Sequence, residues 1–346
     1  MLIYLGLYST TVIFAFFYSH STKNVNYGLY IFSVLFAYIF LFAFRSQNVG
    51  TDTAGYIRQY LVYYADSPKT EPLYRLFNVV LRRLCFPPEL FLMIEACLIC
   101  FFTGTLFSKQ NIIFVLPLTF ILLYIPSFNI TRQCLALSIA YFALFAEKND
   151  KKFRICVLLI LSVLIHKSIV FYCVLFILSE YIHFSKRMYE IFFLGLFIFI
   201  KLGIFEVLMY KIILMTPYRG YTDFFEGLHT SISLINYPKW FLYFFLFDFV
   251  ENNQKKDLLN MLILCMFSSD ILVRLYPFLF RLSFLFSPVI IPCIKAAYEE
   301  KKISKLKLMQ KVYFLTILGY FSLQFVLNIR VGNNGLIPYS LSLCAY

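Results

Sequence analysis

The feature that most constrains this chain is a series of apolar runs that recurs from residue 2 to residue 328, with no hydrophilic stretch of domain size between them. A bilayer core of about 30 Å is crossed by roughly 20 helical residues, and many of the runs approach that length. The candidate spans cover residues 2–18, 28–44, 89–107, 112–126, 134–146, 155–182 (interrupted), 190–206, 239–250, 258–272, 278–294 and 312–328. The sequence therefore predicts one integral membrane domain over residues 1–346, an all-α polytopic transmembrane bundle of about 11–12 spans.

Composition excludes two other classes of protein. Hydrophobic residues make up 61% of the chain, whereas a soluble globular domain has about 45–50%. The formal net charge is +13, but Lys and Arg form short clusters between apolar runs, which argues against nucleic acid as a partner. Cys97 and Cys100 match CxxC in spacing alone, because they fall inside a predicted span without the four ligands that a closed metal site needs. We expect no metal and no cofactor.

Two basic clusters fix the predicted orientation, because Lys and Arg in short loops stay cytoplasmic. They lie within residues 148–154 and 295–311. With both inside, the two termini face out, and the interrupted span 155–182 must enter and leave on the same side. That span is too short for two full crossings. We therefore predict a re-entrant hairpin or a broken helix that turns at His166-Lys167-Ser168.

Many cations fall on the predicted outer side, against the topology rule. An arginine or lysine near the centre of a span costs about 2.5–3.5 kcal/mol, so such residues are functional candidates. The planar fork of arginine suits two hydrogen bonds to a phosphate. We therefore predict a site for a pyrophosphate or another polyanion on this side. The cations are Arg45, Arg58, Lys69, Arg75, Arg82, Arg83, Arg132, Lys167, Arg219, Lys239, Arg274, Arg281 and Arg330.

An amphipathic helix is predicted over residues 71–84, lying in the membrane interface. Its apolar residues recur at helical spacing, while Arg75, Asn78 and Arg82 fall on the other side. Glu71-Pro72 stands at its start, where proline is tolerated and a carboxylate meets the positive end of the helix dipole. Glu71 is thus either a dipole partner or a functional carboxylate.

Three further candidates each allow a functional and a structural interpretation. Asp52 follows a polar segment that leaves the second span, and is either a catalytic carboxylate or the N-cap of a helix that starts near Ala54. Arg132 opens the fifth span, where it either binds an anion or snorkels to the surface. His166 lies at the break of the interrupted span and is either an acid, base or phosphate donor, or a structural histidine.

The second half of the chain adds three arginines. Arg274 stands four residues after Asp270, the spacing of a helical ion pair, so it is either paired there or binds substrate. Arg281 has no acidic neighbour in sequence, which favours binding. Arg219 belongs to the outer segment 210–239, whose aromatic residues either stack on sugar rings or form an interfacial belt.

Several of these residues stand in motifs that resemble those of the EpsG family. The motifs follow one another in order: Val49-Gly50-Thr51-Asp52-Thr53 with Tyr56, Glu71-Pro72-Leu73-Tyr74 with Leu76 and Asn78, Arg132-Gln133 with Leu135-Ala136, Leu164-Ile165-His166-Lys167-Ser168, the Arg281 segment before Pro288, and Ile337-Pro338-Tyr339. They span nearly the whole chain. Arg45, Asp52, Glu71, Arg132, His166 and Arg281 match motif positions.

The resemblance implies a GT-C-like membrane glycosyltransferase of the Wzy type, which polymerises O-antigen, capsule or exopolysaccharide. Such enzymes join undecaprenyl-pyrophosphate-linked repeat units at the periplasmic face of the bacterial inner membrane. The implied partners are those lipid-linked oligosaccharides, the bilayer, and a flippase and a chain-length regulator of the same pathway.

We hypothesise that arginines neutralise the departing diphosphate, because charge stabilisation at the leaving oxygen would supply much of the catalysis without a metal. Arg132, with Arg274 or Arg281, would bind the pyrophosphate. Asp52 or His166 would deprotonate the acceptor hydroxyl, with Glu71 orienting one of them. The alternatives are a flippase or other transporter of lipid-linked sugars, a membrane O-acyltransferase, and a ligase that moves finished glycan to another lipid. Transporters often show internal repeats between their halves, and none is visible here.

Overall fold

The computed structural model describes residues 1–20, 25–62, 70–146, 151–202, 237–251, 253–275, 280–299, 308–332 and 335–341, together with positions 207, 211, 214 and 215. Within these residues the regular elements are helices, and one isolated bridge joins Arg45 to Leu341. The chain forms two compact units, Met1–Val174 with Lys301–Tyr346, and Leu175–Glu300. The prediction of an all-α chain is confirmed for the described residues, and a single membrane domain stays a prediction.

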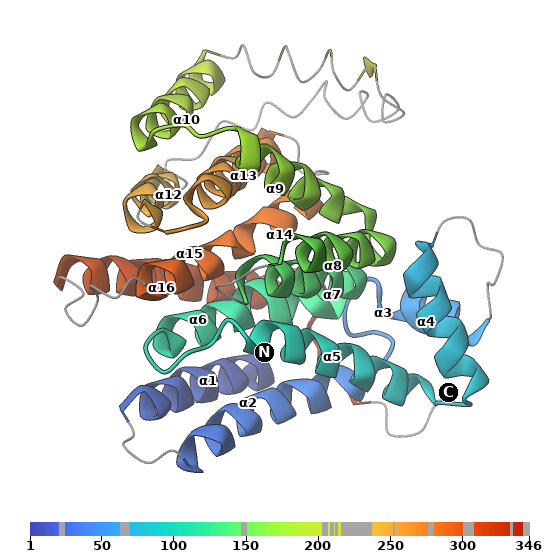
Figure 1. Ribbon diagram of the computed structural model, residues 1–346. Helices are drawn as coiled ribbons and strands as arrows, with labels where there is room; N and C mark the ends of the chain where they lie inside the picture. The colour runs from blue at the N-terminus through green and yellow to red at the C-terminus, as the bar shows by residue number, and fades with distance from the viewer. Residues whose placement is uncertain are drawn as a thin grey trace. The chain divides into compact units, whose positions relative to one another are not determined.

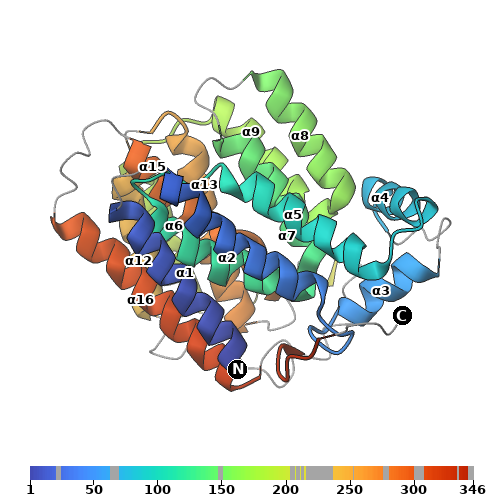
Figure 2. The ribbon, with the colours of Figure 1, turned by 90° about the horizontal axis from the view of Figure 1, so that it is seen from below.

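The first unit contains the helices of the N-terminal half and the last helix of the chain (Figures 1 and 2). They are α1 (Leu2–His20), α2 (Val25–Ala43), α3 (Thr53–Leu61), α4 (Pro72–Arg83), α5 (Pro88–Gly104), α6 (Ile112–Thr119), α7 (Ile125–Phe145), α8 (Lys152–Ile165) and α16 (Leu308–Arg330). Neighbours α1, α2 and α5 contact one another in that order, and α7 packs against both α5 and α8. The motif positions of the N-terminal half therefore share one unit.

The second unit contains α10 (Lys186–Lys201), α12 (Tyr237–Val250), α13 (Lys256–Leu275), α14 (Phe280–Phe286) and α15 (Ile290–Glu299), and α9 (Val170–Tyr181) runs from the first unit into it. A short 3-10 turn, η6 (Ser287–Val289), joins α14 to α15. Two of its buried charged residues, Lys239 and Asp270, form an ion pair between α12 and α13. The indole Nε1 of Trp240 donates to the other Asp270 oxygen at 2.7 Å.

Four described helical segments are long and apolar enough to cross a bilayer. They are Leu2–His20, Ile112–Phe145, Phe280–Glu299 and Leu308–Arg330, and Gly28–Ala43 is a shorter apolar helix. Large apolar side chains remain exposed on several helices, for example Phe36 at 57% and Leu315 at 54%. In a membrane protein such faces are solvated by lipid. The chain is thus a multi-pass membrane protein, while the count of about 11–12 spans stays a prediction.

The predicted spans 112–126 and 134–146 form one helical run, because a π turn, η1 (Phe120–Tyr124), links α6 directly to α7. The run kinks at Ile130, whose φ of −112° and ψ of 49° are not helical. Before the kink, Phe128 packs on Tyr4 at the start of α1. After the kink, Phe142 packs on Phe102 near the end of α5. The kink therefore separates a part of the run that packs on α1 from a part that packs on α5.

The interrupted span is broken at His166. Helix α8 ends at Ile165, His166 is extended with φ of −152° and ψ of 116°, and a 3-10 turn, η2 (Lys167–Ile169), leads into α9. This is the broken helix that the sequence predicts, whereas its re-entry into the membrane stays a prediction.

The predicted interfacial helix is α4, which begins at Pro72 directly after Glu71. Its apolar residues divide between two environments: Tyr74 and Leu81 are buried, while Leu76 and Val80 are 55% and 47% exposed. One face of α4 therefore packs on the unit and another is apolar and open.

Candidate active site

Arg45 organises the segment that follows α2. Its side chain is only 1% exposed, its guanidinium carbon lies 3.8 Å from the centre of the Phe42 ring, and its Nη1 donates to the Phe42 carbonyl at 2.8 Å. Its Nε donates to Thr53 Oγ1 at 3.0 Å. The Thr53 hydroxyl donates in turn to the Val49 carbonyl at 2.6 Å, with the Phe128 carbonyl 3.1 Å away. Arg45 thereby holds residues 46–53, which we call the 46–53 loop.

The 46–53 loop docks onto the kink of α7. The Thr51 amide donates to Asn129 Oδ1 at 2.7 Å, next to the non-helical Ile130. Gly50 makes this approach possible, because its φ is +87° and a Cβ there would lie 2.3 Å from the Phe128 carbonyl oxygen. Only glycine adopts such a conformation without strain and leaves room for a backbone oxygen.

The C-terminal motif lies over the same loop. Gly50 donates its amide to the Gly335 carbonyl at 2.9 Å, and Ser46 donates its own to the Ser340 carbonyl at 2.9 Å. The Tyr339 hydroxyl donates to the Leu41 carbonyl at the end of α2, at 2.7 Å. Residues about three hundred positions apart therefore fix the position of the loop.

Asp52 occupies the N-cap position of α3 but does not cap the helix. The structure gives its side chain no cap hydrogen bond, and its Oδ1 accepts from the Thr51 hydroxyl at 3.3 Å. The side chain is half-exposed. The N-cap interpretation therefore lacks its defining contact.

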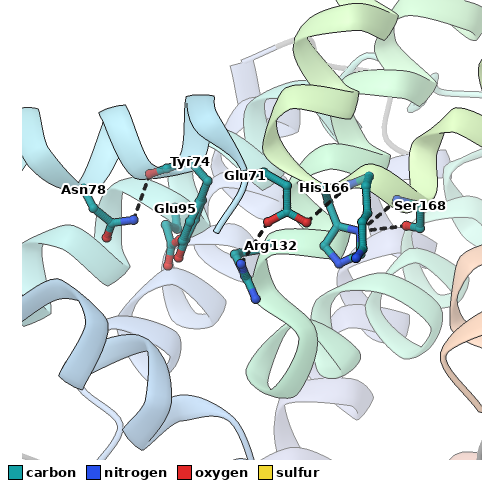
Figure 3. A network of polar contacts seen from close by, with 8 residues as sticks. Glu71, Tyr74, Asn78, Glu95, Arg132, His166 and Ser168 are labelled. Carbon is teal, nitrogen blue, oxygen red and sulfur yellow. Dashed lines mark hydrogen bonds and ion pairs between the residues drawn. The ribbon is translucent and has the colours of Figure 1, made fainter. Parts of the chain in front are cut away.

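Glu71 and Arg132 form the central ion pair of the site (Figure 3). Arg132 Nη1 donates to Glu71 Oε2 at 3.0 Å, and the two side chains are 20% and 14% exposed. The other carboxylate oxygen, Oε1, accepts from the Lys167 amide at 3.4 Å, so Glu71 joins α7 to the break after α8. Glu71 precedes α4 without a side-chain cap bond, so its carboxylate is committed to these distant partners. Charge-assisted bonds in such a partly dry setting are stronger than exposed ion pairs.

Arg132 lies between two tyrosine rings. Its guanidinium carbon is 5.6 Å from the centre of the Tyr56 ring and 5.4 Å from that of Tyr74. Both distances are within the range of a cation–π contact. Burial raises the pKa of Tyr56 to about 12, against the opposing effect of the Arg132 charge, so this phenol is neutral at physiological pH. The charge of Asp52 acts in the same direction as burial and raises the pKa of Tyr56 further.

Glu95 is a member of this network that the motif analysis missed. It lies on α5 with no exposed surface, and its Oε1 accepts from the Tyr74 hydroxyl at 2.7 Å (Figure 3). Its Oε2 is buried and has no hydrogen-bond partner among the described residues. Its signal in the sequence is a carboxylate well inside the predicted span 89–107, where a buried charge is costly.

His166 ends α8 beside this network, and Ser168 determines its tautomer. The Ser168 amide donates to His166 Nδ1 at 3.3 Å, and the Ser168 hydroxyl lies 2.8 Å from the same nitrogen. Because an amide can only donate, Nδ1 accepts, and the proton of the neutral ring is on Nε2. The ring is therefore set to donate a hydrogen bond from Nε2 (Figure 3).

The other predicted substrate-binding arginines are not members of the network around Glu71 and Arg132. Arg274 is in the last turn of α13 and Arg281 is an exposed residue of α14, its guanidinium carbon 5.9 Å from the centre of the Phe280 ring. Both belong to the second unit. Arg219 lies outside the described residues. Among the described residues, no group of three His, Cys, Asp or Glu could hold a metal ion.

The sequence matches the EpsG family over residues 28–341. This chain belongs to the EpsG family. The match covers nearly the whole chain and every motif position described above, as the sequence resemblance predicted. No curated protein and no solved structure matches the chain. Membership of the EpsG family indicates a membrane protein of the polysaccharide polymerase type, associated with glycosyltransferase-like activity.

Proposed function

We propose that this chain is a polysaccharide polymerase that joins undecaprenyl-pyrophosphate-linked oligosaccharide repeat units. It would act at the periplasmic face of a bacterial inner membrane, as a GT-C-like glycosyltransferase, and a flippase and a chain-length regulator would work beside it. The observation that supports the proposal most is the joining of Glu71, Arg132 and the His166 segment, three motifs far apart in sequence, in one partly buried network.

The proposed reaction is a substitution at the anomeric carbon of the donor glycan. The acceptor hydroxyl forms a bond to that carbon, the bond from the carbon to the phosphate oxygen breaks, and its electron pair leaves on the diphosphate. Arg132 is suited to neutralise that charge, because Tyr56, Tyr74 and Glu71 hold its guanidinium in place before substrate arrives.

The hydrogen bonds of His166 favour one of its two predicted roles. Because Nδ1 accepts from Ser168, Nε2 of the neutral ring carries the proton and has no free lone pair with which to act as a base. We therefore assign His166 as a donor to the diphosphate or to a sugar oxygen. Asp52 then receives the proton of the acceptor hydroxyl, as a half-exposed carboxylate without a helix-capping role. Arg45 acts as a positioning residue for the 46–53 loop, since its own contacts are to protein groups.

The test is a complementation assay in cells that lack the chromosomal gene. Arg132→Ala and His166→Ala, at verified membrane levels, should reduce the long-chain glycan to single repeat units on a gel. Arg154→Ala is the matched control, because Arg154 lies on α8 with its guanidinium 5.2 Å from the Phe142 ring, away from the network. Ladders of normal length from the two site variants would remove Arg132 and His166 from the mechanism.

A further inference from the structure

A second basic site lies between α3 and α4, apart from the Glu71–Arg132 pair. A small, partly enclosed pocket there is lined by Gln59, Tyr60, Thr70, Arg75, Asn78, Val79 and Arg82. The floor is rigid, because the Tyr60 hydroxyl donates to the Phe86 carbonyl at 2.6 Å and its ring stacks on Phe91 with centres 4.4 Å apart. Nothing proposed so far uses this pocket.

The charged residues that line the pocket, Arg75 and Arg82, are both positive. Helices α3 and α4 together contain four arginines and no acidic residue. Arg75 and Arg82 stand seven positions apart on α4, which places them on one face about 10 Å apart along the axis. Neither has an acidic partner among the described residues, and the Arg82 guanidinium lies 6.0 Å from the centre of the Tyr60 ring. Two arginine forks over one pocket are the chemistry that binds phosphate.

Asn78 adds a different requirement. Its Nδ2 donates to the Tyr74 carbonyl at 2.8 Å, which fixes the orientation of the amide. Its Oδ1 is buried and has no hydrogen-bond partner among the described residues. A buried acceptor without a donor is unfavourable, so a ligand that brings a hydroxyl beside its phosphate would satisfy the pocket better than phosphate alone.

The open face of α4 indicates that this ligand is carried by a lipid. Leu76 and Val80 are 55% and 47% exposed, and Leu84, the residue after the helix, is 58% exposed. They form an apolar row beside the arginines. A helix with an exposed apolar row and a basic face lies in the membrane interface, at the depth of lipid phosphates.

We propose that Arg75 and Arg82 bind the pyrophosphate of a second lipid-linked glycan, the acceptor of the proposed polymerisation, with one hydroxyl of its first sugar beside Asn78 in the small pocket that these residues line. This assignment rests on the proposed function, which needs two lipid diphosphates at once. Phosphatidylglycerol carries the same chemistry, a phosphate beside hydroxyls, and is the other possible source of the ligand.

The experiment measures lipid binding and not polymerisation. The purified full-length chain is placed in phosphatidylcholine nanodiscs that contain either undecaprenyl-pyrophosphoryl-N-acetylglucosamine or phosphatidylglycerol, and bound lipid is quantified by native mass spectrometry. The test variant is Arg75→Gln/Arg82→Gln. The control is Arg58→Gln/Arg83→Gln, which removes the same charge, one arginine from α3 and one from α4, at positions that do not line the pocket.

Because the Arg132 site also binds a lipid-linked diphosphate under the proposed function, both variants are compared in an Arg132→Ala background. There the test variant should bind the lipid-linked sugar at least tenfold more weakly than Arg132→Ala alone, while the control changes less than threefold. An equal loss in both variants, or none in either, overturns the pocket as a site. A loss confined to phosphatidylglycerol overturns the assignment to a glycan acceptor. Arg132→Ala keeps the outcome separate from the proposed function, because it should abolish polymer yet retain binding at this pocket.

Discussion

Replacing Gly50 with alanine tests whether docking of the 46–53 loop on α7 is needed for activity. The residue has φ of +87°, where a side chain is strained by about 1–3 kcal/mol. The new Cβ would lie 2.3 Å from the Phe128 carbonyl oxygen, and this is a backbone atom that cannot rotate away. The loop must therefore move off the kink.

The movement breaks two further contacts. They are the bond from the Thr51 amide to Asn129 at 2.7 Å and the contact of the Thr53 hydroxyl with the Phe128 carbonyl at 3.1 Å. A hydrogen bond contributes about 0.5–1.5 kcal/mol net. Together with the strain, the free energy of docking the loop on α7 becomes less favourable by about 2–6 kcal/mol. Even the lower value is a factor of about 30 in the docking equilibrium.

The assay compares glycan ladders and the thermal midpoint of the purified protein in detergent. Gly50→Ala should lose long-chain glycan and melt earlier. Gly55→Ala is the control, because Gly55 is inside α3 and a Cβ there meets nothing within 4 Å. In a helix that change stabilises by about 0.5–1 kcal/mol, so its ladder should match wild type. A wild-type ladder and midpoint for Gly50→Ala would refute the reasoning.

Three other substitutions follow from the same network. Arg132→Lys keeps the charge but loses the planar fork held between the tyrosine rings, so polymer yield should fall at least tenfold, and a yield within twofold of wild type would contradict this. Tyr74→Phe leaves the Glu95 carboxylate without its donor and should lower the stability of the folded protein by about 1–3 kcal/mol. The thermal midpoint in detergent should fall, and an unchanged midpoint would show that the bond is unimportant. His166→Gln places an amide nitrogen near the position of Nε2 and should retain more polymer than His166→Asn, whereas equal loss in both would favour a role as base.

The sequence predicted the elements whose signals are local. Apolar periodicity predicted most helices, Glu71-Pro72 predicted the start of α4, and the polar His166-Lys167-Ser168 segment predicted the break after α8. In these cases the determining contacts lie within a few residues, so the pattern contains them.

Long-range contacts cannot be predicted from such local patterns. The Tyr74–Glu95 bond joins residues 21 positions apart, and the Tyr339–Leu41 bond joins residues 298 apart. The kink at Ile130 was expected as a loop between two spans, but a single non-helical residue suffices for it. A polar motif shows that a residue is unusual and leaves open which distant backbone it will meet.

The kink also restricts how this part of the chain can vary in length. On one side of Ile130, Asn129 accepts from the 46–53 loop, and on the other, Arg132 donates to Glu71. Adding or removing one residue between them would rotate the rest of α7 by about 100° and shift it by about 1.5 Å. The guanidinium would then leave its carboxylate although hydropathy is unchanged. The spacing between Asn129 and Arg132 is therefore as constrained as these two side chains are.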